Sequence, residues 1–226
     1  MTQPRALPQP HRLNTPRAAA LAGVLFAILF ATALTLIRLA LPEGAAPGSQ
    51  WLDVGSTKLR VASILMPFAG ITFLWFIGVV RDGFGQFEDK FFSTVFIGSG
   101  LLFLAMIFAS SAVGAGLVAS SGAIDAADSS AVATFGRMML LGLTKTYALR
   151  MGAVFMMSLA TIWLRTGLMP RWLVLVTYVL AVCLLAVSDI SMWITLVFPL
   201  WVLVVSLLVL VHAGVIDLHR DEPVHS

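Results

Sequence analysis

Long apolar runs, separated by short polar segments, occupy most of this chain of 226 residues. A helix needs about 20 apolar residues, at about 1.5 Å of rise each, to cross the hydrocarbon core of a bilayer. A soluble domain of this size would have no use for five or six runs of about 17 residues or more. Charged residues make up 11% of the chain, against roughly 25% in soluble proteins. The sequence therefore predicts an all-α integral membrane protein.

The runs predict one domain, a bundle of six transmembrane helices joined by short loops. The expected spans are residues 18–41, 59–80, 92–119, 138–164, 172–188 and 190–211. We expect residues 1–17 to be a disordered, basic tail and residues 212–226 to be a polar tail, since both lack apolar periodicity. The first run opens like a signal peptide, with Ala31-Thr32-Ala33 as a small-x-small site. Because it stays apolar as far as Leu41, an uncleaved helix is favoured over cleavage.

Basic residues predict how the bundle is oriented. With the N-terminus inside, the cytoplasmic tails and loops hold Arg5, Arg12, Arg17, Arg81, Lys90, Arg165, Arg171 and Arg220, whereas the outer loops hold Lys58, Arg60 and Arg137. The positive-inside rule then favours two cytoplasmic termini in a bacterial-type inner membrane. Three cations inside the spans (Arg38, Lys145 and Arg150) map nearer the outer edge. If these three are counted with the outer loops, the cytoplasmic side has eight basic residues and the outer side has six.

The fourth span hints at chemistry because it carries Lys145 and Arg150. Counting back from Arg165, Lys145 lies about 30 Å and Arg150 about 22 Å along the helix. A cation costs about 2.5 to 3.5 kcal/mol at the centre of a span and less near the interface. Each side chain should therefore have a partner or reach water. An α-helical count places the two cations about 140° apart, too far for one narrow pocket.

Two hypotheses account for the charges near the outer boundary. In the first, a ligand-binding vestibule is formed by Arg38, Lys145, Arg150 and Asp189, with Asp189 pairing Arg150 or Lys145. Such a site would bind an anionic small molecule or an acidic lipid headgroup. In the second, each cation extends separately to lipid phosphates, and Asp189 caps the hairpin between the last two spans. The angle between Lys145 and Arg150 favours the second.

Another charged cluster lies between the second and third spans. It consists of Arg81, Asp82, Glu88, Asp89 and Lys90. We expect a solvated cytoplasmic hairpin there, with binding of a partner as the functional alternative. In the third span, Ser110 and Gly114 fit a small-xxx-small pattern, which lets helix backbones approach closely.

The remaining polar residues do not predict an enzyme, a metal site or a cofactor. The four histidines, His11, His212, His219 and His225, lie in the tails or at a helix end, which argues against zinc and haem sites. Serine and threonine in the spans have no histidine at their level and suit packing. No basic patch with interleaved aromatic residues predicts nucleic-acid binding. Cys183, the single cysteine, is expected to pack as a small apolar residue.

The favoured function is therefore non-enzymatic. We expect a multi-pass protein that binds or translocates an anionic or amphipathic small molecule through the cationic outer vestibule. Since six helices enclose little pathway, we also expect a homo-oligomer. The alternative is a structural or regulatory membrane subunit that docks a partner protein through the third span or the loop from Arg81 to Lys90.

Overall fold

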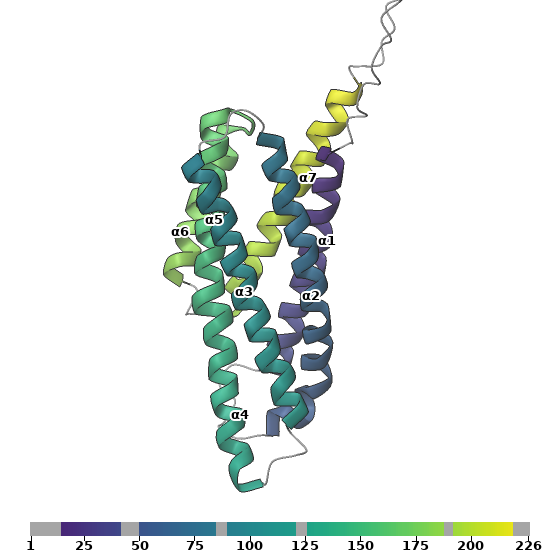
Figure 1. Ribbon diagram of the computed structural model, residues 1–226, viewed down its shortest axis with the longest axis vertical. Coiled ribbons are helices and arrows are strands. Elements are labelled where there is room, and N and C mark those ends of the chain that lie inside the picture. Colours follow the sequence, from purple (N-terminus) through teal and green to yellow (C-terminus); the bar gives the residue numbers. More distant parts are fainter. Residues whose placement is uncertain (1–14, 42–49, 85–89, 121–125, 188–191, 219–226) are drawn as a thin grey trace, which may run out of the picture.

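The computed structural model describes residues 15–41, 50–84, 90–120, 126–187 and 192–218, which are almost entirely helical (Figure 1). The helices are α1 (Thr15–Ala40), α2 (Gln50–Phe84), α3 (Lys90–Ser120), α4 (Ala126–Leu141), α5 (Leu149–Thr166), α6 (Arg171–Val187) and α7 (Val197–Leu218). A π-helical segment, η2 (Gly142–Ala148), joins α4 to α5, and a 3₁₀ turn, η3 (Met192–Leu196), precedes α7. Five spans are long and apolar enough to cross a membrane, and α6 is a shorter apolar helix. The predicted all-α membrane bundle is confirmed.

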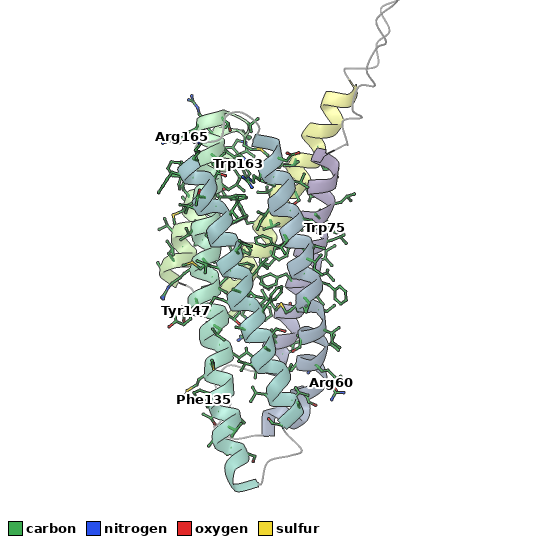
Figure 2. The ribbon with its side chains drawn as sticks, viewed as in Figure 1. Arg60, Trp75, Phe135, Tyr147, Trp163 and Arg165 are labelled. Atoms are coloured by element: carbon green, nitrogen blue, oxygen red, sulfur yellow. The ribbon has the colours of Figure 1, made fainter. Side chains whose placement is uncertain are left out.

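The helices pack side by side in an elongated bundle. α1 packs against α2 and α7, α3 packs against α2 and α5, and α5 packs against α6. Arg165 lies near one end of the bundle, which we call the Arg165 end, and Arg60 lies towards the other, which we call the Arg60 end (Figure 2). In Figure 1, α6 stops part-way along the bundle, whereas α4 extends farthest at the Arg60 end.

The fourth span is longer than the expected 138–164. Its helix is continuous from Ala126 through η2 to Thr166, which at 1.5 Å per residue is about 60 Å and about twice the thickness of a hydrocarbon core. The sequence before Met138 is small and polar, so hydropathy marked it as a connection. Hydropathy records where a helix enters lipid, and a helix can continue beyond that point.

The π-helical segment changes the geometry around Lys145. The backbone N–H of Leu149 donates to the carbonyl of Thr144, five residues earlier. Because a π turn holds more residues than an α turn, each residue there advances by less than 100°. The α-helical estimate of about 140° between Lys145 and Arg150 is therefore wrong, and the two cations lie closer in azimuth than that estimate predicts.

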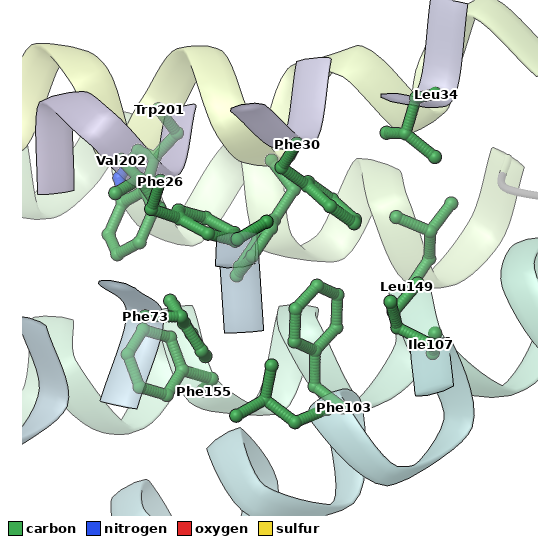
Figure 3. Packing of buried hydrophobic residues seen from close by; sticks show 14 of the residues in the cluster. Phe26, Phe30, Leu34, Phe73, Phe103, Ile107, Leu149, Phe155, Trp201 and Val202 are labelled. Carbon is green, nitrogen blue, oxygen red and sulfur yellow. The ribbon is translucent and has the colours of Figure 1, made fainter. Parts of the chain in front are cut away.

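A cluster of buried aromatic side chains fills the middle of the bundle (Figure 3). Phe73 of α2 is its hub. The centroid of its ring lies 4.5 Å from that of Phe26, 5.2 Å from that of Phe155 and 5.4 Å from that of Phe103. Phe198 of α7 completes the contact at 5.9 Å. The rings come from α1, α2, α3, α5 and α7, so this cluster joins five helices of the bundle.

Small residues let α3 approach its neighbours, as the sequence predicts. Ser110 and Gly114 are both buried. A Cβ atom at Gly114 would lie 3.2 Å from a methyl group of Leu140 and 3.6 Å from Leu59. The packing expected for Cys183 is wrong, however, because its side chain is exposed on α6. Hydropathy alone does not separate the buried face of an apolar helix from its exposed face.

Candidate binding site at the Arg60 end

On two of the helices, charged side chains towards the two ends are separated by about the thickness of a bilayer core. On α2, Arg60 precedes Asp82 by about 33 Å of helix. On the fourth span, Lys145 precedes Arg165 by about 30 Å if the π-helical rise is close to the α-helical rise. A hydrocarbon core is about 30 Å thick. On each of the two helices, the separation of the charged residues therefore matches the thickness of a hydrocarbon core, with Arg60 and Lys145 towards the Arg60 end and Asp82 and Arg165 towards the other end.

Aromatic rings accompany the cations at both ends. At the Arg165 end, the Arg165 guanidinium lies 4.6 Å from the centroid of the Phe92 ring. At the Arg60 end, the Arg38 guanidinium lies 5.2 Å from the centroid of the Trp193 ring, which is more than half exposed. Cation–π contacts of this kind stabilise a guanidinium that is partly removed from water, and tryptophan is enriched at membrane interfaces.

A layer of hydroxyl groups lies at the depth of Lys145. The hydroxyl oxygens of Ser110 and Thr144 are 2.7 Å apart, and both groups donate towards the carbonyl of Leu140, at 3.2 and 2.9 Å. Both side chains are buried. In an apolar environment such hydroxyl groups satisfy backbone carbonyls that a π turn leaves out of the α-helical pattern. Because Lys145 follows Thr144 directly, the hydrogen bonds of Thr144 hold the backbone position from which the Lys145 side chain extends.

A reciprocal pair of serines joins α2 to α3 next to this layer. The hydroxyl of Ser63 donates to the carbonyl of Ser111 at 3.3 Å, and the hydroxyl of Ser111 donates to the carbonyl of Ser63 at 3.4 Å. From this pair, an open groove of about 290 Å³ runs between the two helices. Its lining is Arg60, Ser63, Ile64, Ala115, Val118 and Ala119. The lining of the groove is therefore mainly apolar, and Arg60 is its one charged residue.

The structure describes the three predicted cations of the vestibule, which lie on three different elements. Arg38 lies on α1, Lys145 on η2 and Arg150 on α5, and each is half-buried. Arg150 is about 8 Å deeper than Lys145 by helix rise. Asp189 lies outside the described residues, as does its proposed pairing with Arg150 or Lys145. A shared pocket for these side chains stays a prediction.

The charged cluster between the second and third spans is described in part. Arg81 and Asp82 are exposed in the last turn of α2, and Lys90 is exposed at the start of α3. All three lie at the Arg165 end, where charged side chains suit solvent or lipid headgroups. Glu88 and Asp89 lie outside the described residues.

The sequence places Arg60 near the outer boundary together with the predicted vestibule cations, but Arg60 is assigned to a loop and is not among the predicted ligand-binding residues. A signal was present in the spacing of Arg60, Ile64, Phe68 and Ile71, which places one cation and three apolar residues on a single helix face. The expected second span, residues 59–80, already contains all four positions. In the part of the chain that the structure describes, no group of three or more metal-binding side chains occurs.

No protein family, curated protein or solved structure matches the chain. What the residues themselves define is a class, a multi-pass helical membrane bundle with an aromatic core and cations at both ends.

Proposed function

We propose that this protein binds an anionic or amphipathic small molecule at the Arg60 end of the bundle, without catalysing a reaction. We place that end at the outer face of a cell inner membrane, with both termini in the cytoplasm, because the Arg165 end carries the cations that the positive-inside rule assigns to the cytoplasm. The observation that supports binding is that Arg60 and Lys145 lie towards the same end of the bundle, each about one hydrocarbon thickness of helix rise from a charged residue at the other end, Asp82 and Arg165 respectively.

The energetics of buried charge favour an anionic ligand at this end. A half-buried cation near the membrane edge has lost part of its hydration, so an anion that reaches it compensates more than it would in water. Phosphates and carboxylates also match the planar fork of arginine, which can donate two parallel hydrogen bonds. The layer of bonded hydroxyl groups at Ser110 and Thr144 holds the helices around these cations in one arrangement.

The packed core favours binding over translocation by a single copy. Phe26, Phe73, Phe103, Phe155 and Phe198 are all fully buried at the middle of the bundle. A solute that crossed between these helices would have to displace a cluster of rings packed at interior density. If the protein does translocate its ligand, we expect the pathway to lie between copies in a homo-oligomer.

The direct test is a paired replacement, Lys145→Ala with Arg150→Ala, in the purified full-length protein. Retention of phosphatidylglycerol is compared with that of phosphatidylcholine by native mass spectrometry, and assembly is followed by light scattering. We expect the paired variant to lose its preference for the anionic lipid while keeping the wild-type assembly. An unchanged preference would contradict the proposal. The conservative pair Lys145→Arg with Arg150→Lys controls for general damage to the helix and should retain the preference.

A second candidate is a structural or regulatory subunit, which is favoured by an exposed apolar face on α4. Val132, Phe135, Met138 and Met139 are exposed there, beyond Lys145 towards the Arg60 end, where α4 extends farthest (Figure 1). Exposed apolar patches of this kind are typical of contact with protein or membrane. Replacing Phe135 and Met138 by serine should change assembly and leave the preference for anionic lipid intact if this candidate is correct.

A further inference from the structure

The groove between α2 and α3 is open and has a mainly apolar lining. Its only charged lining residue is Arg60, which is exposed. In the part of the chain that the structure describes, no hydrogen bond or ion pair engages the Arg60 guanidinium. Ser63, the other polar lining residue, already donates to the carbonyls of Leu59 and Ser111. The groove therefore offers one available cation beside an apolar wall.

The wall on α3 is open because its residues are small. Ala115 and Ala119 line the groove, and a Cβ atom built at the neighbouring Gly116 would meet nothing within 4 Å. No side chain of the described residues fills this space. The inner end is limited by the Ser63–Ser111 pair, which holds the two helices together.

An exposed apolar stripe continues from the groove towards the centre of the bundle. Ile64, Phe68 and Ile71 follow Arg60 on the same face of α2, and they are 58%, 57% and 47% exposed. Trp75 lies farther along, on the same side of the molecule as Arg60 (Figure 2). The face is therefore cationic at the membrane edge and apolar inward of it. That polarity matches a molecule with an anionic head and a hydrocarbon chain.

We propose that the groove binds an anionic phospholipid, with its phosphate on Arg60 and one acyl chain along Ile64 and Phe68. This inference rests on the proposed function for its placement at the membrane edge, and it narrows the ligand to a phospholipid. A soluble anion would be held by Arg60 alone, since the rest of the lining is apolar or already hydrogen-bonded. A phospholipid is delivered at this depth by the bilayer itself, and its chain matches the apolar stripe.

The test uses the full-length protein in nanodiscs of mixed phosphatidylcholine and phosphatidylglycerol. Electron paramagnetic resonance of spin-labelled lipids measures the relative association of each lipid with the protein. We expect Arg60→Gln to lower the preference for phosphatidylglycerol about two- to fivefold, the range for one solvent-accessible ion pair. Lys58→Gln removes a nearby cation that does not line the groove, and it should leave the preference unchanged. Equal effects of the two variants would overturn the site.

Two further arms keep the test decisive. Ala115→Phe fills the groove and keeps the charge, so it should also lower the preference, and an unchanged preference would overturn the site even if Arg60→Gln failed to fold. Inorganic phosphate at millimolar concentration should not displace the labelled lipid, and displacement would show a soluble-anion site instead.

If the Lys145→Ala and Arg150→Ala pair loses the preference while Arg60→Gln and Ala115→Phe keep it, the groove is excluded and the proposed function stands. If every variant keeps the preference for phosphatidylglycerol, both the groove site and the proposed function are wrong.

Discussion

The hydroxyl oxygens of Ser110 on α3 and Thr144 on η2 lie 2.7 Å apart and are both buried. They meet at the carbonyl of Leu140, where the fourth span changes from α-helical to π-helical. π turns inside α-helices are rare and are frequent at functional sites. Here the turn sets the direction of Lys145, the next residue, at the level where we propose that the ligand binds.

Removing the hydroxyl of Thr144 should weaken the bundle modestly. Thr144→Val keeps the shape of the side chain and leaves Ser110 without this partner, so we expect a loss of about 0.6 kcal/mol and at most about 1.7 kcal/mol, the average and the maximum for hydrogen bonds between membrane helices. Unfolding in mixed detergent micelles measures it. Thr134→Val is the matched control, because the Thr134 hydroxyl bonds only to the carbonyl of Ser130 on its own helix. Equal stability of the two variants would contradict this role for the Ser110–Thr144 contact.

Truncating the hub of the aromatic core should be far more costly. Phe73→Ala would leave a cavity between rings from four other helices, and we expect a loss of about 3 to 5 kcal/mol. Phe68→Ala, about one and a half turns away on the same helix, removes a side chain that is 57% exposed and should cost much less. The same unfolding experiment checks both. A similar loss for the two variants would mean that Phe73 is not central to the packing.

A methyl group added to α1 should disrupt the contact with α2 and α7. A Cβ atom at Gly23 would overlap the hydroxyl oxygen of Ser206 and lie 2.8 Å from the ring of Phe76, and both of those side chains are buried. We expect Gly23→Ala to cost about 1 to 3 kcal/mol, as overpacking does elsewhere. Gly98→Ala is the control, since a Cβ atom there meets nothing within 4 Å. Thermal melting in detergent should separate the two, and a wild-type melting temperature for Gly23→Ala would refute the packing described for α1.

Depth along the membrane could be predicted from the sequence, because it depends on helix rise alone. The same 1.5 Å per residue that places Lys145 about 30 Å from Arg165 applies whatever the neighbouring helices are. The membrane class followed from apolar length in the same way. These quantities are properties of one helix at a time, so one sequence is enough to estimate them.

Direction around the helix could not be predicted in the same way. The angle between Lys145 and Arg150 depends on the π segment, and that segment is accompanied by a hydroxyl from Ser110, a residue of another helix. Likewise, Arg60 becomes a site residue only because Ala115 and Ala119 of α3 leave space beside it. Contacts between helices determine both the angle between Lys145 and Arg150 and the space beside Arg60, and no local sequence pattern predicts those contacts.

The most direct test of the account is the membrane depth of Arg60. Spin labels are placed one at a time at positions 60, 71 and 147 in a Cys183→Ser background, and their accessibility to oxygen and to a nickel chelate is measured in phospholipid vesicles. All three native side chains are exposed, so the labels should be tolerated. We predict that the label at 60 reports the depth of the lipid phosphates, that the label at 71, about 16 Å along α2 from Arg60, reports the hydrocarbon interior, and that the label at 147 reports a depth between the two, as Tyr147 lies inward of Arg60 (Figure 2). A label at 60 as deep as the label at 71 would contradict the account.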